Sequence, residues 1–338
     1  MSAPPLVSVL LPVRNAAGSI ARAVASVQAQ AGVGWELVVI DDGSTDGTRD
    51  WLRQAAGNDR RIRLLEQPAL GLVAALNAGL AASRGGFIAR MDADDECHPE
   101  RLAAQASWLE KRPGIGLVSC LVGFGGDRGA NAGYALHVDW LNAVVTPEQI
   151  ALNRFVESPL AHPSVMFRRE LVVRHGGYRD GDFPEDYELW LRWLDAGVAM
   201  TKVPRELLTW HDAPERLSRT DPRYDPEAFF RVKAEYLAKH LRRIGRTEVW
   251  IWGAGRPTRK RAAHLVTHGL RITGYIDVDE KKTGKLVGGV PVIPPEALPA
   301  PGRVFVLGYV SSRGAREMIR GELALRGYAE GRDFLMGA

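Results

Sequence analysis

Residues 86–96, GFIARMDADDE, place three aspartates and a glutamate directly after a mostly apolar run. Such a short run is typical of a strand buried on both faces of a sheet. Like charges at the end of a buried strand repel one another and lose hydration. A bound cation would remove that cost, and the pattern Asp-X-Asp offers oxygen ligands suited to Mg²⁺ or Mn²⁺. The alternative is a solvated acidic loop in which Asp95 and Glu96 cap a helix that starts near Pro99.

Strand and helix patterns alternate before this stretch. The strand patterns cover 6–13, 36–40 and 62–66, and the helix patterns cover 19–27, 49–56 and 71–83. Strict alternation predicts an α/β fold with a mostly parallel sheet flanked by helices, in which ligands bind where loops leave the carboxyl ends of strands. The acidic segments 41–46 and 92–95 both follow a predicted strand, so we expect both at this edge of the sheet.

Length and composition indicate a soluble protein with two domains. The chain has 338 residues, and a domain usually has ~100 to 200. No apolar run reaches the ~18 residues of a membrane helix, and the N-terminus lacks a basic region. Two cysteines, Cys97 and Cys120, cannot form a disulfide framework, which agrees with a reducing compartment. We therefore expect a cytoplasmic protein.

The formal net charge of +4 is unevenly distributed. Residues 1–245 carry 29 basic and 31 acidic side chains, whereas residues 246–338 carry 15 and 9. Mild positive charge of this kind suits anionic small molecules or an acidic membrane surface. Without a basic stripe or a motif, it argues against nucleic acid as a partner.

Four segments carry a resemblance to a known family: 7–30, 35–48, 70–105 and 183–194. In this order they resemble the family 2 glycosyltransferases of GT-A fold, over roughly residues 5–220. The resemblance implies a metal-dependent, inverting enzyme that moves a sugar from a nucleoside diphosphate sugar, with UDP expected, to a hydroxyl of a saccharide or glycoconjugate acceptor. Such transfer would serve bacterial surface polysaccharide synthesis. The alternative is a nucleotide-sugar binding or regulatory protein with a degenerate transferase domain.

The resemblance also assigns a donor site. It implies that the donor is contacted by Pro12, Arg14, Asp41, Asp42, Asn77, Arg90 and Asp92. Within this set Asp42 is expected to contact the uracil ring, while Asp92 and Asp94 are expected to hold the cofactor, Mn²⁺ or Mg²⁺. Arg14 departs from the family pattern, in which an aromatic ring stacks on the base, although a guanidinium plane can also stack. The alternative for Arg90 is an ion pair with a surface acid.

Inverting transfer also needs a base, because the acceptor hydroxyl must lose its proton in a single in-line displacement. Residues 183–194 begin with a proline and two acids at the start of a helix pattern, where the helix dipole keeps a carboxylate ionised. The resemblance places the base at Asp186, with Glu185 contacting the acceptor or orienting the loop. The alternative is that both acids only cap the helix.

Residues 210–219, WHDAPERLSR, are expected to close over the leaving diphosphate. In this hypothesis His211 is a further metal ligand, and Arg216 and Arg219 contact the phosphates. The alternative for His211 is a packed or exposed structural role. His162, before a proline, resembles the family's segment near the acceptor cleft.

From residue 247 a strand, a Gly-Ala-Gly turn, a helix and a second strand follow one another. Gly253 and Gly255 match the first two glycines of GxGxxG, Thr258 replaces the third, and Asp277 follows at a strand end as a ribose-binding acid would. The segment resembles small Rossmann-like domains appended to sugar-modifying enzymes. We interpret it as a nucleotide-binding or assembly module, with a purely structural appendage as the alternative. The broken fingerprint disfavours an oxidoreductase.

We therefore expect a GT-A glycosyltransferase domain over 1–224, a helical linker over 225–246 and a smaller Rossmann-like α/β domain over 247–338. The linker has the pattern of a basic amphipathic helix that packs the two domains together. Its alternative is peripheral contact with the inner face of a membrane through 239–243. A monomer and a homo-oligomer both stay open.

Overall fold

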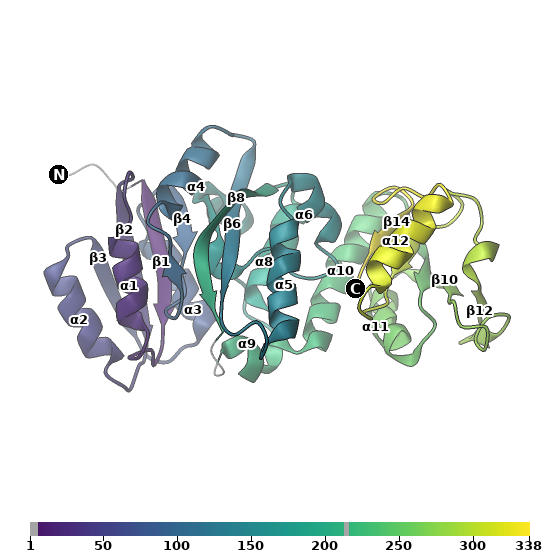
Figure 1. Cartoon of the computed structure of the whole chain (residues 1–338), viewed down its shortest axis with the longest axis horizontal. Helices are drawn as coiled ribbons and strands as arrows, with labels where there is room; N and C mark the ends of the chain where they lie inside the picture. Colours follow the sequence, from purple (N-terminus) through teal and green to yellow (C-terminus); the bar gives the residue numbers. More distant parts are fainter. Residues whose placement is uncertain (1–5, 213–215) are drawn as a thin grey trace. The chain divides into compact units, whose positions relative to one another are not determined.

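The computed structural model describes residues 6–212 and 216–338 and divides the chain into two compact units (Figure 1). Unit 1 consists of Met1–Ile150, Pro159–Gly181 and Arg192–Thr220, and unit 2 consists of Ala151–Ser158, Asp182–Leu191 and Asp221–Ala338. The chain therefore contributes two short segments to unit 2 before it enters that unit for good at residue 221.

Unit 1 is built on an eight-stranded sheet with the strand order β3-β2-β1-β4-β7-β6-β8-β5. The strands are Val7–Val13 (β1), Trp35–Asp42 (β2), Ile62–Gln67 (β3), Phe87–Arg90 (β4), Glu96–Cys97 (β5), Ile115–Gly125 (β6), Met166–Arg168 (β7) and Ala199–His211 (β8). β1 to β4 are parallel, as is the pair β6 and β8, whereas β7 and β5 run antiparallel to their neighbours. The expected α/β fold with a mostly parallel sheet is confirmed.

Helices flank this sheet and join its strands. They are Ile20–Gln28 (α1), Thr48–Asn58 (α2), Leu72–Ala82 (α3), Arg101–Glu110 (α4), Ala132–Ala143 (α5), Pro147–Asn153 (α6), Glu170–His175 (α7), Glu185–Asp195 (α8) and Leu217–Thr220 (α9). The unit boundary runs through α6 and α8, because Ala151–Ser158 and Asp182–Leu191 belong to unit 2. Apolar side chains decide the orientation of the first helix: Ile20, Ala23, Val24 and Val27 recur on one face of α1 and are buried. Every residue of β1 and β2 is buried, as expected for central strands covered on both faces.

The register of the parallel strands places the carboxyl ends of β1, β2 and β4 at one edge. Val13 is paired with Asp41 across β1 and β2, and Leu10 with Arg90 across β1 and β4. Both acidic segments of the sequence leave the sheet at this edge. In parallel α/β sheets this is the edge where ligands bind.

Unit 2 holds a six-stranded sheet with the order β11-β12-β10-β9-β13-β14. Its strands are Glu248–Trp252 (β9), Arg271–Ile276 (β10), Leu286–Val287 (β11), Val290–Ile293 (β12), Val306–Gly308 (β13) and Phe334–Met336 (β14). All pairs except β11 with β12 are parallel. Counted along the chain, the parallel strands follow the order 3-2-1-4-5, which doubly wound nucleotide-binding sheets also use.

Three longer helices belong to unit 2: Pro226–Arg243 (α10), Arg256–Thr267 (α11) and Ala315–Leu325 (α12). The two early segments of the chain join its core, where Phe155, Tyr187 and Leu191 pack in one cluster with side chains of α10. Polar contacts fix the same packing, since Tyr236 donates to Glu188 at 2.5 Å and Lys233 donates to the carbonyl oxygen of Val156 at 3.1 Å. The region expected to be a linker is thus a core helix of unit 2.

None of the helices among residues 6–212 and 216–338 combines the length and the apolar character that spanning a bilayer needs.

Candidate active site

Three aspartates gather in the turn between β4 and β5. Asp92, Asp94 and Asp95 each place one carboxylate oxygen within 4.8 Å of the others. Asp95 is buried and the other two are half-buried. Oδ1 of Asp95 accepts a hydrogen bond from the backbone N–H of His211 at 2.8 Å, whereas its Oδ2 is buried without a hydrogen-bond partner. An orphaned carboxylate oxygen among other carboxylates fits a hard divalent cation, which is ligated by oxygen.

The pKa shifts of Asp94 and Asp95 in this cluster also favour a bound cation. Burial and the charge of Asp92 raise the pKa of Asp94. Burial and the charges of Asp92 and Asp94 raise the pKa of Asp95 well above its usual value. The negative charges are therefore costly in the metal-free protein, and the cluster favours uptake of a positive charge.

The capping role considered for Asp95 and Glu96 is wrong. α4 begins at Arg101, after Glu100 as N-cap residue, and no side chain caps it. Asp95 belongs to the acidic cluster instead, which sequence reasoning missed, although the run Asp-X-Asp-Asp was a signal for a third ligand. Glu96 pairs with Arg22 at 3.1 Å.

His211 ends β8 and supports the cluster through its backbone. Its Nε2 lies 2.8 Å from Oε1 of Glu96, and its Nδ1 lies 3.2 Å from the carbonyl oxygen of Gly125. The group of potential metal ligands found in the described residues comprises the three aspartates and does not include this ring. Metal ligation by His211 stays a prediction, and it would require the ring to leave Glu96 or Gly125.

Arg90 is a buried residue whose guanidinium turns toward the cluster. It donates to Oδ1 of Asp92 at 2.6 Å and to the carbonyl oxygen of Met91, and its side chain is only 2% exposed. Arg90 therefore forms an ion pair with a member of the cluster. By fixing one oxygen of Asp92, Arg90 orients the carboxylate at the end of β4.

The carboxyl end of β2 carries two acids with different partners. Asp41 is buried and pairs with Nε of Arg49 at 2.7 Å. Asp42 accepts hydrogen bonds from the side chain of Gln67 and from the backbone N–H groups of Leu70 and Gly71, at 2.7 to 3.0 Å. Asp42 thus ties the end of β2 to the loop that precedes α3.

The other expected donor residues have distinct environments. Pro12 is buried in β1, and Arg14 is exposed just beyond that strand. Asn77 uses both ends of its amide on the backbone of Tyr178, with Nδ2 donating at 2.9 Å and Oδ1 accepting at 3.1 Å. These contacts give Asn77 a role in holding the segment after α7, and its contact with a donor stays a prediction.

Arg216 lies over two adjacent aromatic rings close to the cluster. Its guanidinium carbon lies 4.6 Å from the ring centre of Trp210 and 5.2 Å from that of Tyr134, whose hydroxyl it contacts. The charge of Arg216 acts on the pKa of both Asp94 and Asp95. Arg219 pairs with Asp212 at 2.5 Å. Residues 213–215 of the expected phosphate lid lie outside the described part of the chain.

The two acids expected to act in proton transfer open α8. Glu185 is buried and accepts a hydrogen bond from the hydroxyl of Tyr224 at 2.7 Å. Asp186 is half-buried, and its Oδ1 accepts from the backbone N–H of Tyr187 at 2.7 Å. Both acids belong to unit 2, whereas the aspartate cluster belongs to unit 1. Their catalytic roles and their capping roles both stay predictions.

The Gly-Ala-Gly turn of unit 2 is held by internal contacts. Gly253 has a φ of +112°, and a Cβ there would lie 2.7 Å from Val310. Oδ2 of Asp277 accepts from the backbone N–H of Ala254 at 2.8 Å and lies 3.2 Å from Nζ of Lys282. Asp277, which was expected to bind a ribose, therefore already holds the Gly-Ala-Gly turn in place.

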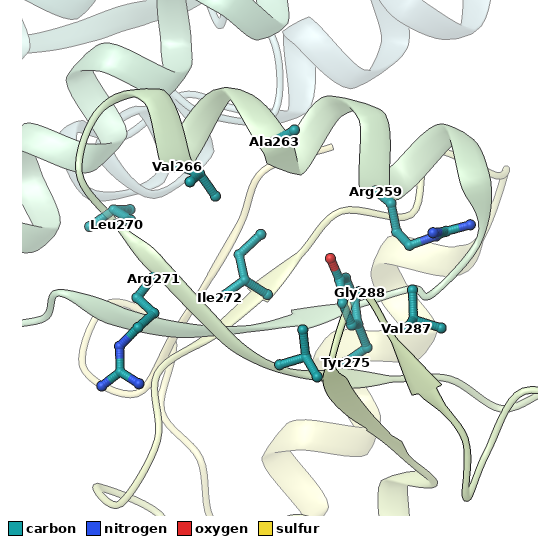
Figure 2. A pocket seen from close by; sticks show the side chains of 10 residues that line it. Arg259, Ala263, Val266, Leu270, Arg271, Ile272, Tyr275, Val287 and Gly288 are labelled. Atoms are coloured by element: carbon teal, nitrogen blue, oxygen red, sulfur yellow. The ribbon is translucent and has the colours of Figure 1, made fainter.

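A hollow in unit 2 lies apart from that turn (Figure 2). It has a volume of about 460 Å³, and its apolar lining comes mainly from one face of α11 and from β10. Figure 2 shows Ile272 at its centre, while the guanidinium groups of Arg259 and Arg271 point away from that centre. Gly253, Gly255 and Asp277 are not among its lining residues.

Comparisons with known proteins agree with the architecture. The family model described as Glycosyl transferase family 2 matches residues 8–176. The chain is 33% identical over 205 residues to the putative glycosyltransferase EpsE of Bacillus subtilis, a match that covers 58% of this chain and 69% of EpsE. It is 38% identical over 124 residues to the putative teichuronic acid biosynthesis glycosyltransferase TuaG of the same organism, covering 36% of this chain and 46% of TuaG.

A solved structure shares the fold. The crystal structure of S. aureus TarS residues 1–349 in complex with UDP-GlcNAc superposes with a TM-score of 0.56 at 17% identity. The superposition covers 78% of this chain and 71% of the TarS chain.

Proposed function

The chain belongs to glycosyl transferase family 2, and on that premise we propose that it is a metal-dependent, inverting enzyme with a UDP-sugar donor and a saccharide or glycoconjugate acceptor. Family membership makes it a glycosyltransferase. We propose, beyond family membership, that the enzyme uses a metal, inverts the configuration of the sugar, takes a UDP-sugar and acts on a saccharide or glycoconjugate.

One observation carries the proposal: the orphaned oxygen of Asp95 inside a group of three carboxylates. Asp92, Asp94 and Asp95 would hold Mg²⁺ or Mn²⁺, and this cation would neutralise charge on the leaving diphosphate. Arg90 orients Asp92, and the backbone of His211 orients Asp95. Arg216 adds a fixed positive charge beside the carboxylates, where an anionic donor gains from it.

In this proposal the nucleobase binds at the carboxyl edge of β1 and β2. Arg14 is exposed there and has a guanidinium plane that can stack on a base, and Asp42 orders the adjacent loop. The complex of TarS with UDP-GlcNAc supports uridine as the base, and the name of TuaG supports a surface polysaccharide as the product. An enzyme of this kind would work in the cytoplasm, at the inner face of the membrane.

Asp186 is proposed as the base, with Glu185 beside it. A carboxylate in the first turn of a helix is kept ionised by the helix dipole and can accept the proton of an acceptor hydroxyl. Glu185 is held by Tyr224, so it suits a positioning role better than proton transfer. Asp186→Asn should lower kcat by roughly 10² or more and leave the donor affinity unchanged. Inversion is checked by the anomeric configuration of the product in an NMR spectrum.

The donor site is tested by calorimetric titration of UDP, GDP and dTDP with Mn²⁺ present or chelated. We expect UDP to bind only with Mn²⁺, and Asp94→Asn to weaken that binding roughly tenfold or more, because a neutral amide oxygen replaces a charged ligand of the cation. Asp277→Asn in unit 2 is the matched control and should bind as the wild type does. Metal-independent binding that is lost in Asp277→Asn would overturn the proposal.

That opposite result would favour a second candidate, a nucleotide-sugar binding or regulatory protein. Its supporting observation is the strand order of unit 2, which doubly wound nucleotide-binding sheets share. The bonds of Asp277 to Ala254 and Lys282 count against it, because a ribose would compete for the same oxygens.

A further inference from the structure

A group of aromatic rings in unit 1 extends away from Arg216, which two of the rings contact. We call it the aromatic row, and it consists of Phe124, Tyr134, His137, Trp140 and Trp210. Three of these residues project from α5, which packs against β6 (Figure 1). Tyr134 lies 5.2 Å from Trp210 and 5.6 Å from Phe124, and His137 stacks on Trp140 at 5.9 Å. Ring centre to ring centre, the contacts form one continuous chain, in which neighbouring rings are inclined by 27° to 55°.

The aromatic row begins beside the aspartate cluster. Trp210 directly precedes His211, whose backbone N–H donates to Asp95 at 2.8 Å, and Arg216 lies over the rings of Tyr134 and Trp210. From Arg216 the rings continue through His137 to Trp140, at the far end of the row. A molecule lying on the row would therefore reach toward the place where the cation and the diphosphate are proposed.

Packing alone does not explain the row. Its rings contact the main core of unit 1, but Tyr134, His137, Trp140 and Trp210 remain half-buried rather than buried. Leu136 on the same helix is 43% exposed. The charged pair Arg128 and Asp139 flanks α5, with 2.6 Å between Nη2 and Oδ2. A partly open run of aromatic faces with charged groups at its edge offers both apolar and polar contacts to one ligand.

We propose that the aromatic row is the acceptor subsite, and that it takes a pyranose whose hydroxyls are mostly equatorial. Such a ring has faces made of C–H bonds, which pack on an aromatic face, while its hydroxyls point outward to polar groups. Trp140 and His137 hold the ring that lies farther from the bond being formed. This inference rests on the proposed function, because it gives the acceptor of that transfer a place and a shape.

The flat faces of the aromatic rings also predict which sugars the row prefers. A sugar with axial hydroxyls breaks up its C–H face and loses contact area on a flat aromatic ring. We therefore expect cellobiose and chitobiose to bind better than α-1,2-mannobiose, in which an axial oxygen at C2 interrupts one face of each ring, as a hydroxyl on one ring and as the glycosidic oxygen on the other.

The test titrates these three disaccharides into protein saturated with UDP and Mn²⁺, followed by tryptophan emission and by saturation-transfer NMR. We expect Trp140→Ala to weaken binding of the equatorial disaccharides roughly tenfold, and Trp140→Phe to restore it to within about threefold. Trp108→Ala is the matched control, because Trp108 is a half-buried tryptophan on α4 that stacks with Arg112 outside the row. It should bind all three sugars as the wild type does.

The two proposals fail in different ways. Absence of UDP binding with Mn²⁺ in the wild type would sink the proposed donor site. The acceptor subsite is overturned if UDP binds normally but none of the disaccharides does, or if Trp140→Ala binds them as tightly as Trp108→Ala. Equal melting temperatures of the two alanine variants, with and without UDP, exclude a merely structural effect of Trp140.

Discussion

At the scale of single residues, Asp95 has one carboxylate oxygen with a hydrogen-bond donor and one buried oxygen without. Its Oδ1 is fixed by the amide of His211, which is 116 positions away in sequence, and its Oδ2 faces other carboxylates without a donor. An unsatisfied buried oxygen costs about 1 to 3 kcal/mol. A cation that removes this cost gains affinity from it.

The first consequence is a stability change that depends on pH and metal. Because the folded protein raises the pKa of Asp94 and Asp95, the metal-free form loses stability as pH rises from the unfolded pKa through the folded pKa. Asp95→Asn removes one buried charge, so we expect it to melt higher than the wild type at pH 7 without metal. Scanning fluorimetry between pH 5 and 8, with Mn²⁺ or with chelator, measures both effects.

Metal should reverse this order. On the proposed function, we expect Mn²⁺ at one hundred times its Kd to stabilise the wild type by about 2.7 kcal/mol, and the variant by much less. An equal rise in melting temperature in both proteins would show that the ion binds elsewhere.

At the scale of elements, the turn after β2 links two distant loops through one glycine. Gly43 has a φ of +71°, and a Cβ there would lie 2.7 Å from the backbone nitrogen of Ala69. The same loop contains the backbone N–H groups of Leu70 and Gly71, from which Asp42 accepts hydrogen bonds. Strand end and loop therefore approach so closely that no side chain fits between them.

We expect Gly43→Ala to destabilise the protein by roughly 1 to 3 kcal/mol and to weaken nucleotide binding, because the turn must open and release Asp42. Gly47→Ala in the same segment is the control, since its φ is −71° and no atom lies within 4 Å of the added carbon. Chemical denaturation and UDP titration of both variants measure the difference. Similar values for the two would mean that the close approach is unimportant.

Local pattern predicted the first elements well. β1, α1, β2 and α2 lie where apolar periodicity places them, because each buries its apolar residues against its neighbours in sequence. β5 and β7 were not foreseen, since strands of two and three residues carry almost no pattern. The place of Asp95 could not be derived either, because its partner His211 arrives from β8, far along the chain.

At the scale of the whole molecule, the two units are formed by interleaved segments of the chain. Ala151–Ser158 and Asp182–Leu191 belong to unit 2, whose main part starts only at Asp221. No pattern in the sequence marks these short segments, because their assignment depends on packing against α10. A domain boundary at residue 224 stays a prediction, and the interleaving predicts how a cut there behaves.

A fragment of residues 1–224 lacks α10 and so exposes Phe155, Tyr187 and Leu191, which pack in the same core. We expect it to bind a dye for apolar surface and to melt below a fragment of residues 1–245, which keeps that helix. Fluorescence titration with the dye and thermal melting compare the two. Identical behaviour would support an independent domain ending at 224.

The interleaved path also sets an order of events on the ribosome. When residue 220 has been made, the two early segments of unit 2 still await the remaining 118 residues, which takes roughly 6 to 24 s at ordinary translation rates. Tyr187 and Leu191 stay exposed to chaperones and proteases during that interval, while β1 to β4 can already pair. Stalled nascent chains long enough to expose 224 or 338 residues should therefore differ in protease cleavage after Tyr187, with protection only in the longer one.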